Sequence, residues 1–78
     1  MMKITVYGSE KCPWTEKTID WLESKGVKKF KFHDVLKDFK MREEMIKKSG
    51  QYTLPVTEMD GKIIIGFDRQ HLERILLS

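Results

Sequence analysis

Strand-type and helix-type runs alternate along this 78-residue chain, and their order limits the fold to the α/β class. Residues 3–7, 27–35, 54–59 and 62–67 have the β-branched and aromatic content of strands. Apolar residues recur at helical spacing over residues 13–25, over residues 39–49 and after Asp68. Asp60-Gly61 is typical of a two-residue hairpin turn, whereas a helix between two strands favours a right-handed parallel crossover. The predicted order is βαβαββα, a four-stranded mixed sheet flanked by three helices.

Size and composition predict a single domain over residues 1–78. Fifteen basic and twelve acidic residues give a net charge of +3, and the two signs are interleaved. This pattern indicates a solvated surface and lacks the clustered basic face of a nucleic-acid-binding protein. No apolar run reaches membrane-spanning length, and the first residues resemble a strand more than a secretory signal. A single cysteine excludes a disulfide framework and favours a reducing compartment, so we expect a cytoplasmic protein.

The only cysteine, Cys12, falls between the first strand-type run and the first helix-type run. The first N–H groups of a helix have no partner within it, and the helix dipole makes that end positive. Pro13 suits the first helical position, Lys11 adds a positive charge, and the hydroxyl and N–H of Thr15 can point back at the sulfur. We therefore predict that Cys12 is a reactive thiolate with a pKa below the usual value of about 8.5. The alternative is a small, buried and inert residue.

Three stretches together resemble the glutaredoxins and glutaredoxin-like redoxins of the thioredoxin superfamily. They are Cys12-Pro13-Trp14-Thr15, then residues 42–50 followed by Thr53-Leu54-Pro55, and last Asp60-Gly61 through Gly66-Phe67-Asp68. The resemblance extends over essentially the whole chain. It implies a thioredoxin-like fold and thiol–disulfide exchange.

The resemblance also implies a cis peptide bond before Pro55, which would lie against Cys12, and a groove for glutathione or a peptide thiol. The backbone of Leu54 would pair with the ligand, and Asp68 with the start of the last helix would hold the γ-glutamyl end. Tyr7, Ser9 and Lys11 would flank the sulfur. The implied catalytic residues are Cys12, Pro13 and Thr15, and the implied substrate-binding residues are Lys11, Trp14, Gln51, Thr53, Leu54, Pro55, Gly66, Phe67 and Asp68.

The chain departs from the family pattern at two places. Thr15 stands where most dithiol relatives have a second cysteine, so the protein cannot close an internal disulfide; whether this threonine is natural or introduced stays open. Gly66-Phe67-Asp68-Arg69 replaces a glycine pair followed by a second aspartate. This stretch is closer to redoxins that serve ribonucleotide reductase and are recharged by thioredoxin reductase.

The favoured hypothesis is a mainly monomeric oxidoreductase that uses Cys12 in monothiol exchange. Glutathione or another small thiol would be its co-substrate, with no resident cofactor and no metal. Its substrates would be disulfide-containing proteins, with ribonucleotide reductase as a candidate, and thioredoxin reductase is an alternative reductant. The other hypotheses are a non-catalytic module that binds glutathione, a peptide or an iron–sulfur cluster, and a dithiol redoxin whose resolving cysteine is replaced by Thr15. His33 and His71 lack the spacing of a zinc site.

Overall fold

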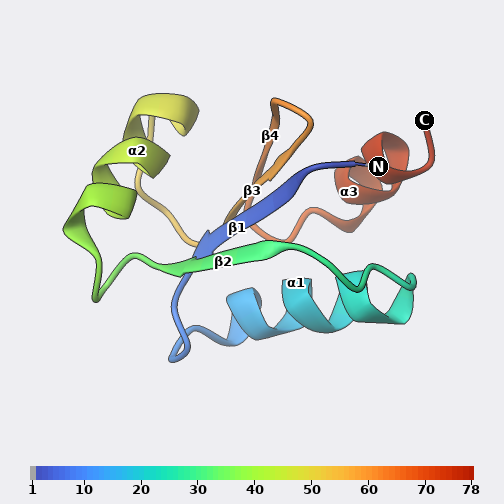
Figure 1. The fold of residues 1–78 in the computed structure, drawn as a ribbon, viewed down its shortest axis with the longest axis horizontal. Helices are drawn as coiled ribbons and strands as arrows, with labels where there is room; N and C mark the ends of the chain where they lie inside the picture. Colours follow the sequence, from blue (N-terminus) through green and yellow to red (C-terminus); the bar gives the residue numbers. More distant parts are fainter. Residues whose placement is uncertain (1) are drawn as a thin grey trace.

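The elements follow the predicted order βαβαββα (Figure 1). The structure is a computed structural model that describes residues 2–78. Its elements are β1 (Ile4–Gly8), α1 (Pro13–Ser24), β2 (Lys31–Asp34), α2 (Phe39–Ser49), β3 (Val56–Met59), β4 (Lys62–Ile65) and α3 (Arg69–Leu76).

The four strands form one mixed sheet in the order β2-β1-β3-β4. β1 is parallel to β2, as a right-handed crossover through α1 predicts. It is antiparallel to β3, and β3 is antiparallel to β4 across the Asp60-Gly61 turn. The predicted thioredoxin-like sheet of mixed direction is therefore confirmed.

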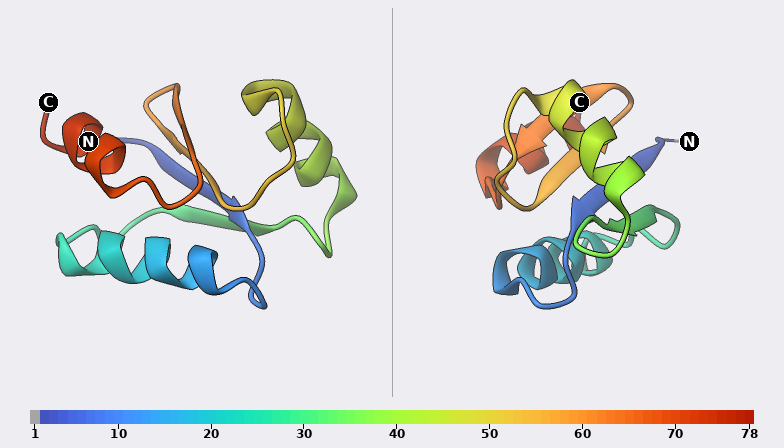
Figure 2. Two further views of the ribbon diagram at one scale, coloured as in Figure 1. Left: turned by 180° about the vertical axis from the view of Figure 1, so that it is seen from behind. Right: turned by 90° about the vertical axis from the view of Figure 1, so that its left-hand side faces the viewer.

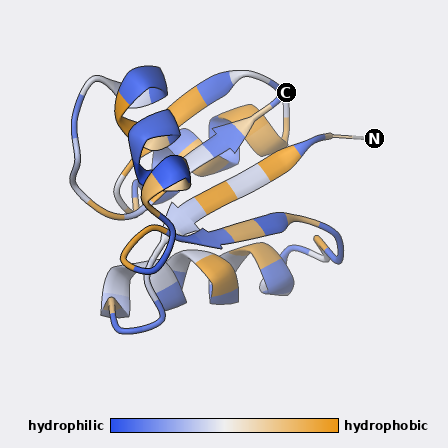
Figure 3. Ribbon diagram, turned by 60° about the vertical axis from the view of Figure 1, so that its left-hand side comes forward, coloured by the Kyte–Doolittle hydropathy of each residue, from blue (hydrophilic) through white to orange (hydrophobic). Residues whose placement is uncertain are grey.

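Alternate residues of β1 point to opposite faces of the sheet, and different helices cover the two faces (Figures 2 and 3). Ile4 and Val6 are buried in one cluster with side chains of α1 and α3, including Leu22 and Leu72. Tyr7 is buried in a second cluster on the face that α2 covers. Because β1 is buried along its whole length, it holds the centre of the sheet and delivers its C-terminal end into the interior.

Three predicted strands are shorter than the sequence suggested. The prediction of a strand over residues 27–35 is wrong for its first half, because β2 begins only at Lys31, which pairs with Thr5. Val27 and Phe30 precede that pairing and pack against the core without strand structure. β3 starts at Val56 instead of residue 54, and β4 ends at Ile65 instead of residue 67. Strands extend only as far as a neighbouring strand supplies hydrogen-bond partners.

The helix ends follow local signals in the sequence. The Asp38 side chain accepts a hydrogen bond from the Met41 N–H at 3.2 Å, so it is the N-cap of α2. Gly50 ends the same helix in the left-handed conformation, with φ of 72°. Gly26 follows α1 with φ of 80°. These three assignments confirm the predicted helix boundaries to within a residue or two.

Candidate active site around Cys12

Cys12 is the N-cap of α1, and Pro13 follows it at the first helical position, as predicted. Its N–H donates to the Ser9 carbonyl at 3.1 Å, and its own carbonyl accepts from the Glu16 N–H at 3.1 Å. The thiol makes no capping hydrogen bond and is partly exposed. The turn between β1 and α1 therefore fixes the cysteine backbone while its sulfur remains accessible to a substrate.

Two opposing effects act on the thiol. Burial raises the pKa of Cys12, but hydrogen bonding from the Thr15 side chain and from the backbone of Thr15 and Trp14 together lowers this pKa by more, so the net shift is downward. Lys11, whose charge was predicted to add to this effect, is exposed, and the groups that lower the pKa of Cys12 are those of Thr15 and Trp14. The thiolate is therefore favoured by groups of the first helical turn.

Thr15 lies in the interior directly behind this turn, with only 1% of its surface exposed. Its Oγ1 accepts a hydrogen bond from the Ser9 N–H at 3.3 Å. Since that bond uses a lone pair of the oxygen, the hydroxyl proton stays free to be donated to the sulfur. Ser9 also accepts from the Lys11 N–H at 3.1 Å through its Oγ, which ties the turn together.

The segment that enters β3 reaches the same end of the sheet (Figure 2, left). Tyr7 and Val56 are paired, so Pro55 falls opposite Gly8 at the next position of the ladder. The Thr15 side chain lies directly against Gly8. The Leu54–Pro55 peptide bond is cis, as predicted, and Pro55 is buried. The register thus brings Pro55 to the end of the sheet that carries Cys12 and Thr15.

The connection from β4 to α3 contacts the Cys12 turn through an aromatic pair. The rings of Trp14 and Phe67 stack with centroids 6.4 Å apart and planes 28° apart. Lys17 Nζ lies 4.6 Å from the Trp14 ring centroid, and 53% of Trp14 remains exposed. The Gly66 N–H donates to the Pro55 carbonyl at 2.7 Å. Three segments far apart in the sequence therefore meet at one place.

Asp68 is the N-cap of α3 and accepts the His71 N–H at 3.1 Å through Oδ1. The residue is exposed, so this capping role leaves the carboxylate open to solvent. An exposed carboxylate beside the unpaired N–H groups of a helix start offers both a negative and a positive partner to a ligand.

The loop before Pro55 is held by Gln51. Its Oε1 accepts from the Thr53 N–H at 2.6 Å, and its Nε2 donates to the Thr53 carbonyl at 3.3 Å. Ser49 Oγ lies 3.4 Å from the same Nε2. The Gln51 amide is therefore engaged inside the loop, whereas the Thr53 side chain is exposed and Leu54 is half-buried.

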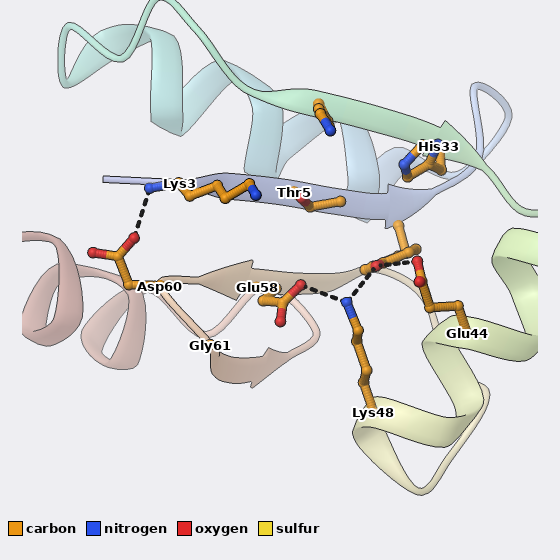
Figure 4. Close-up of a pocket in the computed structure, with 10 residues that line it drawn as sticks. Lys3, Thr5, His33, Glu44, Lys48, Glu58, Asp60 and Gly61 are labelled. Atoms are coloured by element: carbon orange, nitrogen blue, oxygen red, sulfur yellow. Dashed lines mark hydrogen bonds and ion pairs between the residues drawn. The ribbon is translucent and has the colours of Figure 1, made fainter. Parts of the chain in front are cut away.

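Tyr7 does not flank the sulfur, which corrects the placement implied by family resemblance. Its hydroxyl donates to Glu44 at 2.8 Å and accepts from Lys48 at 3.3 Å, and Lys48 also binds Glu58 at 2.9 Å (Figure 4). Burial and the Glu44 bond raise the pKa of Tyr7, and the Glu58 bond raises the pKa of Lys48. These groups line a polar pocket of about 380 Å³ that includes His33. It lies on the α2 face, away from the packing of α1.

Within residues 2–78, no helix is long and apolar enough to cross a membrane. Over the same residues, no group of three or more His, Cys, Asp or Glu side chains is placed to hold a metal ion. The sequence analysis missed the contact of Gly8 with Thr15 and the stacking of Trp14 on Phe67. No local pattern marks either contact, since each joins segments that only the folded chain brings together.

Comparison with known proteins gives a consistent result. The family profile described as Glutaredoxin matches residues 4–64. An uncharacterized glutaredoxin-like 8.6 kDa protein in the rubredoxin operon of Clostridium pasteurianum is 38% identical over 73 residues, covering 94% of this chain and 96% of that protein. Glutaredoxin 3 of Escherichia coli strain K12 is 37% identical over 68 residues, covering 87% of this chain and 81% of its own length.

The solved structures agree with this assignment. The crystal structure of a glutaredoxin from Archaeoglobus fulgidus superposes with a TM-score of 0.89 at 25% identity, covering 100% of this chain and 89% of that one. Together with the mixed sheet, the cis bond before Pro55 and the cysteine at the start of α1, these matches show that the chain belongs to the glutaredoxin family.

Proposed function

We propose that the protein is a thiol–disulfide oxidoreductase that exchanges disulfides through the single thiolate of Cys12. The observation that carries the proposal is the state of this thiol. Cys12 is partly exposed at the N-terminus of α1, and the first helical turn lowers its pKa. A thiolate that is both populated and accessible is what nucleophilic attack on a disulfide requires.

The reaction proceeds in two exchange steps. The Cys12 thiolate attacks the glutathione sulfur of a mixed disulfide, a new sulfur–sulfur bond forms, and the substrate sulfur leaves as a thiolate that takes a proton from water. A second glutathione thiolate then attacks that sulfur of the Cys12 mixed disulfide. Oxidised glutathione leaves and the Cys12 thiolate is regenerated, so the substrate sulfur is reduced at the expense of the one free glutathione that attacks in the second step.

The segments around Cys12 carry the groups that would hold the glutathione part. Leu54 precedes the cis bond and lies outside β3, so we assign its backbone to pairing with the cysteinyl residue of the ligand. The exposed Asp68 carboxylate suits the ammonium group of the γ-glutamyl end, and the first N–H groups of α3 suit its carboxylate. Trp14 and Phe67 form the apolar wall on the same side.

Phe67 gives a reason to consider a second reductant. Gly66-Phe67 resembles redoxins recharged by thioredoxin reductase, and the ring of Phe67 is committed to stacking on Trp14. Thioredoxin reductase is therefore the second candidate reductant beside glutathione. Protein disulfides, with that of ribonucleotide reductase as one candidate, are the substrates to compare.

The test is a coupled assay with a glutathionylated peptide as substrate. One arm supplies glutathione with its reductase, and the other supplies thioredoxin reductase, both with NADPH consumption as the readout. We expect saturable turnover in the glutathione arm and none with Cys12→Ser. Turnover only with thioredoxin reductase would reassign the reductant, and the absence of turnover in both arms would favour a binding module over an enzyme.

A further inference from the structure

Gly8, the last residue of β1, lies unusually close to the side chain of Thr15. A Cβ atom built on Gly8 would fall 2.5 Å from Thr15 Cγ2, 2.5 Å from Thr15 Oγ1 and 3.0 Å from Thr15 Cβ. Atoms cannot approach to 2.5 Å in a packed interior without displacing one another. The space that a side chain at position 8 would fill is therefore already occupied by the threonine.

The backbone of Gly8 gives no other reason for a glycine. The glycines with positive φ among the described residues are Gly26, Gly50, Gly61 and Gly66, and Gly8 is a strand residue outside that set. Any residue can adopt an extended conformation, so glycine is required here for close approach alone.

The threonine is not free to move aside. Thr15 is 1% exposed, and the Ser9 N–H donates to its Oγ1 at 3.3 Å. A β-branched side chain in a helix has few χ1 rotamers, and this one is packed on both γ atoms. A cysteine at position 15 would bring only one γ atom to the same place, whereas threonine brings two and uses all the space that Gly8 leaves.

We propose that Gly8 is a positioning residue for exchange at Cys12, because its missing side chain admits Thr15 to the place where Thr15 Oγ1 accepts the Ser9 N–H, and the Ser9 carbonyl in turn accepts the Cys12 N–H. The proposal rests on the proposed function of Cys12 and adds to it a residue outside the cysteine turn. The downward shift in the pKa of Cys12, which hydrogen bonding from the Thr15 side chain and backbone produces, agrees with this geometry.

The variant that tests the proposal is Gly8→Ala. The added methyl group should displace Thr15 from its place behind the cysteine turn and weaken the bond between the Ser9 N–H and Thr15 Oγ1. The rate of Cys12 alkylation by iodoacetamide, measured against pH, should then inflect at a higher pH than in the wild type. At a fixed pH below the wild-type inflection, alkylation should be several-fold slower.

A double-mutant cycle separates the Gly8–Thr15 contact from a general effect of alanine in β1. Thr15→Ala removes the two γ atoms at 2.5 Å and leaves only the Cβ at 3.0 Å, so adding Gly8→Ala to it should shift the alkylation profile far less than Gly8→Ala shifts the wild-type profile. The matched control is Gly26→Ala, at a glycine with φ of 80° and nothing within 4 Å of an added Cβ. It should lower stability without moving the profile, since it lies at the other end of α1.

Folding and alkylation of the single and double variants decide between the possible outcomes. If Gly8→Ala fails to fold while the double variant folds and titrates like Thr15→Ala, the contact is supported. If the double variant also fails to fold, or if Gly8→Ala folds with the wild-type profile, the proposal is overturned. Alkylation needs no exchange activity, so an inactive wild-type protein would overturn the proposed function and still leave the role of Gly8 testable.

Discussion

At the scale of single residues, the proposed chemistry depends on how the first turn of α1 shifts the pKa of one thiol. Cys12 contributes the thiol, and Thr15 and Trp14 supply the groups that favour its thiolate over the neutral form. Lys11, the nearest positive charge in the sequence, is exposed to solvent. Short-range hydrogen bonds outweigh an exposed charge, because water screens the charge and does not reach the buried threonine.

The lowered pKa of Cys12 predicts how alkylation depends on pH. The rate should follow the thiolate fraction and inflect below the usual value of about 8.5. An inflection at or above that value would contradict an activated thiolate.

The same shift predicts how stability depends on pH. Between the lowered and the ordinary pKa, the folded chain binds fewer protons at this group than the unfolded chain does. The contribution of Cys12 to stability is therefore complete above the ordinary pKa and is lost as the pH falls through the lowered one. Urea unfolding measured at several pH values across this range should therefore show a free energy of unfolding that falls as the pH falls in the wild type. Cys12→Ser, which lacks the titrating thiol, should lack this part of the pH dependence.

Tyr7 offers a residue whose role is structural and can be separated from exchange. Tyr7→Phe removes the hydroxyl that bonds Glu44 and Lys48, which should lower the free energy of unfolding by about 1–3 kcal/mol. Thiol exchange should stay at the wild-type rate, because Tyr7 faces α2. Chemical denaturation and the coupled assay measure the two effects, and a loss of exchange rate at full stability would place Tyr7 in the active site after all.

At the scale of elements, the Asp68 side chain at the start of α3 has two roles. Asp68 caps the helix through the His71 N–H, and we propose that its exposed carboxylate also binds the γ-glutamyl end of glutathione. The two roles have different requirements, because capping needs an oxygen acceptor and binding an ammonium group needs a negative charge.

Two substitutions at Asp68 separate these demands. Asp68→Asn keeps a good cap and should change stability by only a few tenths of a kcal/mol, whereas Asp68→Ala should lose about 1 kcal/mol. Both should raise the KM for a glutathionylated substrate, because both remove the carboxylate. Thermal unfolding measures the change in stability, and steady-state kinetics measures the change in KM. An unchanged KM in Asp68→Asn would restrict Asp68 to capping.

At the scale of the whole molecule, a chain with one cysteine has two ways to form a disulfide. It can accept a small thiol, or it can dimerise through two Cys12 sulfurs. A second copy would have to bring its own helix N-terminus against this one, and like partial charges repel. We therefore expect treatment with oxidised glutathione to give mainly a monomer carrying one glutathione, which intact-mass measurement and gel filtration would detect.

Thr15→Cys should convert the protein to a dithiol redoxin. Residues three apart share one face of a helix, and Thr15 lies in the first turn directly after Cys12, so an internal disulfide should form. The variant should reduce the disulfides of insulin several-fold faster than the wild type when no small thiol is present. Equal rates for the two proteins would show that the single-cysteine mechanism is wrong.

The sequence alone determined the order of the elements and the position of Cys12 at the start of a helix. Periodicity, the Asp60-Gly61 turn, the Asp38 cap and Gly50 are local signals, since each depends on residues a few positions apart. Cys12 at the start of α1 belongs to the same category, because Pro13 marks the first helical residue directly after it.

Only the tertiary structure decided how far each strand extends, which face Tyr7 occupies and which distant segments touch. The ladder between β1 and β2 begins at the Thr5–Lys31 pair and leaves residues 27–30 outside the strand, and alternation in β1 gives two faces without saying which helix covers which. The stacking of Trp14 on Phe67 and the fit of Thr15 against Gly8 join separate elements. Such contacts depend on sheet register and helix packing, and those are set by burial of the whole core and not by any short stretch of sequence.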